Sequence, residues 1–361
     1  MDWGQSGRRD SYGFAAVDPF TLVEIAELEC FPSECSVTYG FYTDNKAQAN
    51  IVMTEESYGI AEGNLVRITH TVELPDGTTE TEALGTFFID EAAKTTEGGI
   101  RKRECTCYST MWRLSQSALT ADFVFRTGAS CLDGITSLMQ DGGSTVIQGQ
   151  GASTTRVHTC DGRFALGSNR LKCANEYAGW CGWIVGVDDY GRQVVSEYIQ
   201  PADRAPKHDF SDGADCTYLP SMRETNTGEI ANEVIAFWSR EKDPGDGFGT
   251  AGRAYAALPD ASPYSYASCG VRMTGVLKLS EPCSQADLQA KADAYLAEHD
   301  AAIRYMEIEH VGIPHLRAGD TVYYTNAATG DANLLCEITQ MQISALGPLM
   351  LTKSKLKVVS S

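Results

Sequence analysis

Two segments near opposite ends of this 361-residue chain carry the same short pattern. In EGNLVRITH, Gly63 and Asn64 precede a run that alternates apolar and polar residues. In AGDTVYY, Gly319 and Asp320 precede a comparable run, 256 positions further on. A glycine, a polar residue and then an alternating run are typical of a turn that enters a β-strand. The chain is therefore predicted to build one kind of β-unit twice.

The segments that follow the two glycines support a repeat. After the first glycine, alternation and turn residues predict strands over 63–74, 79–90 and 100–109; after the second, over 319–326, 333–344 and 348–359. Gly-Asp-x-Val before a strand is also common by chance in β proteins. The matching order of strands favours the repeat over chance.

The predicted fold class is mainly β with inserted α+β elements: two similar small antiparallel β-barrels plus an inserted domain. The 34 glycines and the many Thr, Val and Tyr residues agree with a turn-rich β architecture. The expected divisions are an N-terminal barrel at 14–118, an inserted α+β domain at 119–215, a second barrel from 216–240 and 301–361, and an excursion at 241–300.

Three helices and a hairpin are expected in the inserted parts. Ser130 is a suitable N-cap for a helix that ends at Gly142 and Gly143, and a second helix follows in NRLKCANEYAG. WIVGVDDYGRQVVSEYIQP then predicts a hairpin. Residues 241–282, rich in Gly, Pro, Asp and Ala, are predicted to be irregular. The third helix, capped by Ser284, is expected to pack on the insert.

Charge and cysteine content limit the classes of partner and environment. A formal net charge of −19 disfavours tight binding to nucleic acid and to anionic lipid. No apolar run approaches membrane-spanning length, and the N-terminus has no apolar signal-peptide core. The 12 cysteines are expected to be reduced thiols. Cys105 and Cys107 occupy alternate strand positions, share one face, and are not expected to bridge each other.

The sequence predicts no catalytic, cofactor-binding or metal-binding residues, and therefore no enzyme. It lacks C-x-x-C, H-E-x-x-H, G-x-S-x-G, P-loop and EF-hand patterns. GFGTAG at 247–252 matches G-x-G-x-x-G but lacks a strand before it and a helix after it, so we interpret it as a loop. His70 lies on the apolar face of its strand and is interpreted as a core histidine.

Four segments resemble the tail hub proteins of tailed bacteriophages and prophages, the baseplate hub and tail-associated protein family. LGTFFIDEAAKTTEGGIRKRECTCYSTMWRLSQ is similar to the end of that family's first barrel. SCLDGITSLMQDGG is similar to the first helix of its inserted domain, and TNTGEIANEVIAFW to the strand that returns to its second barrel. ADLQAKADAYLAEHDAAIRYMEIEHVGIPHLRAGDTVYY is similar to the helix and strand that lead into that barrel.

The resemblance implies a structural role without cofactors. It implies two equivalent barrels per subunit, so that a homotrimer offers six barrels to a sixfold tail tube, around a central channel for DNA passage. It also implies that the protein joins the tail tube or a distal tail protein to the tip, baseplate or fibre protein. The location it implies is the virion tail, after assembly in the bacterial host cytoplasm.

Two other interpretations remain open from the residues. The first is a carbohydrate-binding or glycan-hydrolysing β protein of a phage tail or cell surface, in which exposed aromatic residues would line a groove. Trp180, Trp183 and Trp238 are the candidates, although packing in a core also accounts for each of them. The second is a disulfide-linked extracellular adhesin.

Overall fold

A computed structural model describes most of the chain. The described residues are 3, 6–97, 99–144, 147–150, 152–158, 161–219, 225–226, 230–239, 250–279, 284–299 and 303–359. Of the glycine-rich motif at 247–252, residues 247–249 lie outside the described residues. Within the described part, none of the helices combines the length and the apolar character that crossing a bilayer requires.

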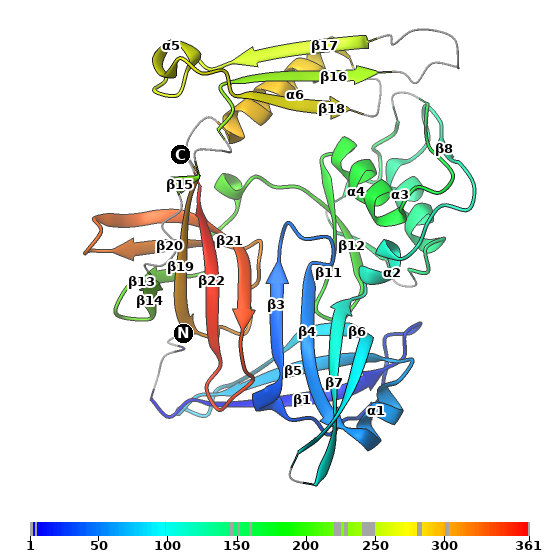
Figure 1. Ribbon diagram of the computed structural model, residues 1–361, viewed down its shortest axis with the longest axis vertical. Coiled ribbons are helices and arrows are strands. Elements are labelled where there is room, and N and C mark those ends of the chain that lie inside the picture. The colour runs from blue at the N-terminus through cyan, green and yellow to red at the C-terminus, as the bar shows by residue number, and fades with distance from the viewer. Residues whose placement is uncertain are drawn as a thin grey trace.

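The protein is mainly β, and most of its described strands form one large sheet with nearly all neighbours antiparallel (Figure 1). Along the sheet the strands are β14 (Cys216–Leu219), β19 (Ile303–Val311), β22 (Leu351–Val358), β21 (Asp331–Ile343), β3 (Ser36–Gly40), β4 (Ala47–Thr54), β7 (Ile100–Ser109), β6 (Thr79–Glu97), β5 (Leu65–Glu73), β1 (Arg9–Val17) and β2 (Glu24–Glu27). Three more strands pair beside this path: β20 (Thr321–Asn326) with β21, β13 (Asp209–Ser211) with β20, and β15 (Thr225–Asn226) with β19.

The sheet contains the same arrangement of six strands twice. In the first β-unit the neighbours run β3–β4–β7–β6–β5–β1, and in the second they run β14–β19–β22–β21–β20–β13. Each strand of one unit has a counterpart at the same place in chain order in the other. The two units differ at the last pair, because β1 is antiparallel to β5 whereas β13 is parallel to β20. The predicted three-strand repeat is confirmed, and it extends to six strands.

The turn that enters each unit's repeated strands is also the same. Gly63 and Gly319 both adopt positive φ, at 79° and 96°, a region that glycine enters without steric penalty. The next residue closes the turn in both cases: the N–H of Asn64 donates to Ala61 O (2.9 Å), and the N–H of Asp320 donates to Arg317 O (3.1 Å). The sequence echo is therefore a repeated backbone turn.

A β-bulge marks the same position in both middle strands. In the first unit the register between β6 and β7 shifts between Ile89 and Glu91. In the second unit the register between β21 and β22 shifts between Ile338 and Gln340. Bulges bend and twist a strand locally. Past this point, each middle strand therefore turns away from the edge partner that it had before the bulge.

The two β-units share one hydrophobic core. Buried side chains from both units form a single cluster, with Ile51, Phe87, Ile308 and Leu356 among its fully buried members. The strand pairings of the described residues do not close either unit into a barrel. The two predicted barrels accordingly remain a proposal.

The segment between the units forms an α+β insert with its own core. Its elements are α2 (Trp112–Ser115), β8 (Phe123–Phe125), α3 (Cys131–Gln140), β9 (Ile147–Gln150), β10 (Gly162–Phe164), α4 (Arg170–Trp180), β11 (Trp183–Val187), β12 (Gln193–Glu197) and the short 3-10 turn η2 (Pro201–Asp203). The predicted N-cap is confirmed, since Ser130 Oγ accepts from the N–H of Asp133. The predicted hairpin is confirmed as β11 paired with β12.

Residues 230–299 correct part of the sequence interpretation. Where an irregular excursion is predicted, the chain forms β17 (Thr250–Ala257), α5 (Tyr266–Cys269) and β18 (Thr274–Leu279). Both strands pair with β16 (Glu233–Ser239), which is predicted to join the second barrel but instead lies in this small sheet. The pattern is hard to recognise because the buried face of β17 consists of Ala254 and Ala256, and alanine is a poor strand former.

The third predicted helix is confirmed as α6 (Gln285–Glu298), capped by Ser284. The predicted packing of this helix on the insert is wrong, because α6 packs on the small sheet (Figure 1). Its buried residues Leu288, Ala292 and Leu296 lie in one cluster with Val234 and Ala236. Two shorter elements complete the fold: η1 (Pro32–Glu34) and α1 (Glu55–Ala61).

His310 makes the stability of the second unit sensitive to pH. Its Nδ1 contacts Val311 O (2.8 Å), its Nε2 contacts Ser354 Oγ (2.9 Å), and its burial lowers its pKa to about 4. The unfolded chain therefore binds one more proton than the folded chain between about pH 6.5 and pH 4. As pH falls through this window, we expect the free energy of unfolding to drop by up to about 1.4 kcal/mol per pH unit because of this residue.

Urea unfolding of the wild type and of His310→Gln, measured from pH 7 to pH 4, checks this expectation. Carboxylates also titrate near the acid end, so the difference between the two proteins is the quantity to follow. The difference in free energy of unfolding between the two proteins should narrow as pH falls. The wild type loses stability because His310 takes up a proton on unfolding, whereas the glutamine side chain takes up none. Curves that stay parallel over the whole range would contradict the assignment to His310.

Candidate functional site

The place where the two β-units meet is a backbone seam between β3 and β21. Four antiparallel pairs join them, from Val37–Ile343 to Gly40–Gln340. The seam continues one step further, because the N–H of Phe41 donates to Thr339 O (3.1 Å), the carbonyl of the bulge residue. β3 of the first unit thus pairs with the edge of β21 in the second unit, just past the bulge in β21.

Side chains on both sides bury the seam. Val37, Tyr39, Met341 and Ile343 each have at most 5% of their surface exposed. Tyr39 also donates from its hydroxyl to Leu84 O (2.5 Å), which ties the seam to β6. Apolar burial of this kind is the main stabilising contribution to such a contact.

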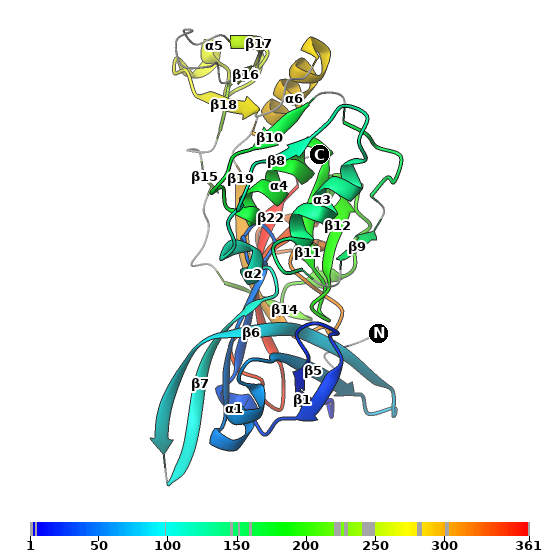
Figure 2. The same cartoon turned by 90° about the vertical axis from the view of Figure 1, so that its right-hand side faces the viewer.

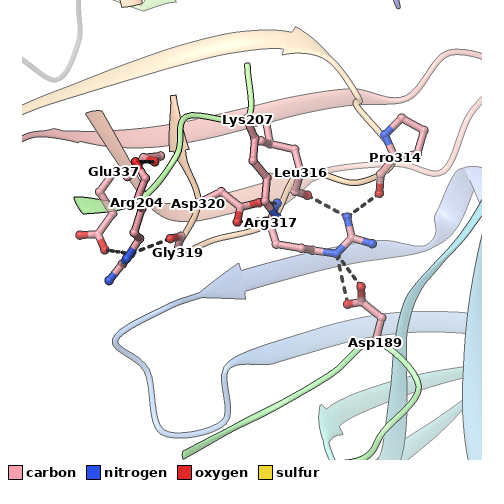
Figure 3. Close-up of polar contacts among 10 residues, drawn as sticks. Asp189, Arg204, Lys207, Pro314, Leu316, Arg317, Gly319, Asp320 and Glu337 are labelled. Atoms are coloured by element: carbon pink, nitrogen blue, oxygen red, sulfur yellow. Dashed lines mark hydrogen bonds and ion pairs between the residues drawn. The ribbon is translucent and has the colours of Figure 1, made fainter. Parts of the chain in front are cut away.

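A buried carboxylate lies beside the seam. The side chain of Glu337, on β21, is 0% exposed and accepts from Arg204 Nη1 (2.7 Å) and from the Tyr42 hydroxyl (2.6 Å). Arg204 follows the insert in sequence, and Nη1 also donates to Gly319 O (2.6 Å), the carbonyl of the repeated turn (Figure 3). One arginine therefore joins the end of the insert to the second unit.

A second arginine connects the second unit with the insert and with the first unit. Arg317 Nε donates to both carboxylate oxygens of Asp189 (3.1 Å each), in the turn between β11 and β12 (Figure 3). Its Nη1 donates to Pro314 O and Leu316 O (2.7 Å each), and its Nη2 donates to Ala83 O (2.7 Å) on β6. Despite its burial, the neighbouring Tyr39 and Asp189 raise the pKa of Arg317, so the guanidinium is charged at all ordinary pH values.

The third ion pair joins Lys207 Nζ to Asp320 Oδ1 (2.8 Å), and Asp320 Oδ2 accepts from the N–H of Arg317 (Figure 3). Both residues of the repeated pattern in the second unit, Gly319 and Asp320, are thus held by basic residues. The three pairs are polar contacts that fix position and orientation. They contain no nucleophile with an adjacent base, and their chemistry is that of a joint between parts of one chain.

A cavity of about 350 Å³ adjoins this joint, where the β11–β12 hairpin faces β3 and β6. Its lining is largely apolar and includes Tyr39, Phe87, Val185 and Val194. A second hollow of about 430 Å³ lies along the seam and is lined by Gln48, Tyr305 and Lys355, among others. Neither cavity is lined by Trp180, Trp183 or Trp238.

The three tryptophans named from the sequence pack against hydrophobic clusters. Trp183 is buried in the core of the insert, and Trp180 stacks on Phe164 with ring centroids 5.0 Å apart. Trp238 packs partly buried against the cluster of the small sheet and α6. The structure does not bring these residues together at one groove, so they give the carbohydrate interpretation no support.

His70 is a core histidine, as the sequence predicts. It is fully buried, and its Nε2 lies 2.5 Å from Asp10 Oδ1, which also pairs with Arg8 Nη2 at 2.7 Å. Burial alone would raise the pKa of Asp10, but the hydrogen bonds from His70 and Arg8 lower it overall. The charged partner of this histidine, Asp10, lies on β1, and the alternation within β5 does not reveal this contact.

Cys35, Cys105 and Cys107 are free thiols. Cys105 and Cys107 are fully buried on one face of β7, as their spacing predicts. Burial raises the pKa of Cys105 to about 11 and that of Cys35 to about 12. At neutral pH these thiols are protonated, and protonated thiols are poor nucleophiles.

The residues of the joint escape sequence reasoning. Arg204 and Glu337 are 133 positions apart, and Asp189 and Arg317 are 128 positions apart, so no local pattern links either pair. One feature could have drawn attention to Glu337. It is the one charged residue in the stretch LLCEITQ, where a buried charge requires a partner.

Comparison with known proteins identifies the fold. The chain is similar to the tail protein from Neisseria meningitidis MC58 (TM-score 0.65, 13% identity, 96% of each chain covered). It is also similar to the 43 kDa tail protein of prophage MuSo2 from Shewanella oneidensis (TM-score 0.62, 10% identity, 96% of this chain and 97% of that chain). Prophage tail protein gp18 from Listeria monocytogenes EGD-e aligns over 96% of this chain and 94% of its own (TM-score 0.57, 10% identity).

No protein-family profile and no curated protein sequence matches the chain. At these levels of identity the likeness is one of fold, and it extends over nearly the whole length of both proteins. The protein thus has the fold of phage and prophage tail proteins.

Proposed function

We propose that the chain is a structural hub protein of a phage or prophage tail, which joins the tail tube to the distal tip or baseplate. The fold that it shares with prophage tail proteins supports this role. The observation that carries the proposal is the repeated six-strand order. Because of this repeat, one polypeptide contains two β-units of similar shape, each of which can contact one subunit of a neighbouring ring.

Two similar β-units per chain allow a threefold assembly of this protein to bind a sixfold ring. A trimer of such chains presents six similar β-units, each potentially a barrel once assembled, to a ring of six tube subunits. The same trimer presents three copies of the insert and of the small sheet to a threefold tip or fibre protein. The proposed partners are accordingly further copies of this chain, a tail tube or distal tail protein, and a tip or fibre protein of the virion.

The charge of the chain is compatible with DNA passing through the ring. Three copies carry a formal charge of −57, three times −19. A channel lined by charge of this sign repels phosphate and does not hold DNA. The proposed biochemistry consists of these contacts and of the channel, without a chemical reaction.

Mass photometry of the purified full-length chain, alone and mixed with its tail tube protein, tests the proposal. We expect a species of about 117 kDa, three times the 39.1 kDa chain, and capping of one end of reconstituted tubes in electron micrographs. A chain that stays at 39.1 kDa in sedimentation velocity at high micromolar concentration and never binds tube ends would contradict the proposal.

A further inference from the structure

The largely apolar cavity beside the joint lies between two separate hydrophobic cores, that of the β-units and that of the insert. Figure 2 shows the β11–β12 hairpin reaching from the insert toward β6, where Thr86 Oγ1 donates to Asp189 O (3.0 Å). Polar contacts at the hairpin turn hold the two parts together, and the cavity of about 350 Å³ stays open beside them. This volume is within the range of cavities that bind small molecules.

The walls of the cavity offer apolar surface from both sides. The first β-unit contributes Leu84 and Phe87, and the hairpin contributes the cross-strand pair Gly186–Val194. A Cβ atom added at Gly186 would meet no atom within 4 Å, so there is free space at this part of the wall. Tyr42, which is 58% exposed, lines the same cavity and marks the side that is open to solvent.

Among the residues that the structure describes, the cavity contains one cation without a counter-charge. Four charged residues line it. Asp189 pairs with Arg317, and Asp188 Oδ2 accepts from Arg192 Nε (2.6 Å). The fourth, Lys46, forms no ion pair with any described residue. A largely buried ammonium group without a counter-charge is unfavourable, because it has lost part of its hydration.

The backbone of Lys46 has a conformation that is unusual for lysine. Its φ is 60°, in the left-handed region that residues with a Cβ atom rarely adopt, and such strain commonly marks binding sites. Its Nζ donates to Phe41 O (2.8 Å) and lies 5.7 Å from the centre of the Phe41 ring. Burial lowers the pKa of Lys46, and the charge of the exposed Asp44 only partly offsets this effect. An ammonium group has three donors, so Lys46 can also donate to an acceptor inside the cavity.

We propose that this cavity binds a small amphipathic anion, a molecule with an apolar body and one carboxylate, whose charge pairs with Lys46. The apolar body fills the space beside Gly186 and Val194, and the carboxylate accepts from Lys46 Nζ. A straight acyl chain and a flat aromatic ring both have this chemistry, and the test distinguishes them. The site lies within one chain, so it does not depend on the proposed hub ring.

Ligand-observed NMR titration of the full-length chain tests the site with two matched pairs of probes. Octanoate and 2-naphthoate carry the anionic group, whereas 1-octanol and 2-naphthol keep the apolar body without it. We expect one of the two anions to bind with a dissociation constant below about 1 mM, and its neutral partner to bind about tenfold or more weakly. The preferred anion shows whether the site is built for an acyl chain or for an aromatic acid.

Variants of the full-length chain locate the bound probe. Lys46→Met removes the cation and should weaken binding of the anion about tenfold or more without affecting the neutral probe, whereas Lys46→Arg should retain most of the affinity. Gly186→Leu fills the free space and should abolish binding of both probes. Lys355→Met is the matched control, because Lys355 lies over the Tyr305 ring (4.6 Å) in the second hollow, and it should bind like the wild type. Thermal unfolding verifies that each variant is folded.

The outcomes separate a specific site from general apolar binding. Binding of an anion that is weakened by Lys46→Met and lost in Gly186→Leu supports the proposal. Equal affinity for the acid and its neutral partner, or an affinity that Lys46→Met leaves unchanged, overturns it. Binding that persists in Gly186→Leu places the probe outside the cavity and also overturns it, as does the absence of binding at millimolar probe concentrations. None of these results affects the proposed trimer, which mass photometry tests separately.

Discussion

Replacing Arg204 by alanine is expected to destabilise the fold by about 3 to 5 kcal/mol. The substitution leaves Glu337 with a side chain that is 0% exposed and with the Tyr42 hydroxyl as its remaining hydrogen-bond partner. A buried carboxylate without its cation is one of the few defects that have effects of this size. Chemical denaturation of the wild type and the variant at pH 7 measures the difference.

Two further variants show whether the buried charge is the cause. Arg126→Ala removes an arginine whose ion pair with Asp161 is exposed, and it should not change stability measurably. The double variant Arg204→Met, Glu337→Leu removes both charges at similar volume and should recover most of the lost stability. A double variant as unstable as Arg204→Ala would mean that the arginine acts through its backbone contacts, including Gly319 O, and not through Glu337.

Gly319→Ala is expected to have the second large effect, of at least about 3 kcal/mol. The φ of 96° alone costs an L-residue about 1 to 2 kcal/mol. A Cβ atom at this position would also meet the Phe41 ring far inside van der Waals contact, where the seam is packed. Equilibrium unfolding in urea gives the difference from the wild type.

The other unit supplies the matched control. Gly63→Ala changes the corresponding glycine, with a φ of 79°, but a Cβ there meets no atom within 4 Å. Its expected cost is therefore the backbone component alone, about 1 to 2 kcal/mol. Equal effects at the two positions would show that contact with Phe41 contributes little to the cost of Gly319→Ala. In that case the Phe41 ring can move aside to make room for the added Cβ atom.

The sequence predicts the local parts of this fold well. Gly63 and Gly319 mark the repeat because a turn with positive φ requires glycine, and that requirement is visible in one dimension. The caps Ser130 and Ser284 are recognisable because their hydrogen bonds reach only three residues. Features whose physical cause spans a few residues can thus be inferred from one sequence.

Features with distant causes are missed for the same reason. β17 is misjudged as irregular because its strand character depends on α6 and β16, which cover its alanines, and not on its own side chains. The seam is missed because nothing in β3 shows that β21 will be its neighbour. The joint of Arg204 and Glu337 also depends on contacts that exist only after the sheet has formed.

The seam also governs the order in which a nascent chain can mature. Tyr39 leaves the ribosome early, whereas its partner Met341 is added about 300 residues later, near the end of translation. The insert can condense during synthesis, but β3 must wait with one edge exposed. A chaperone that shields such edges, or rapid completion of the last strands, would therefore decide how much of the product escapes misassembly.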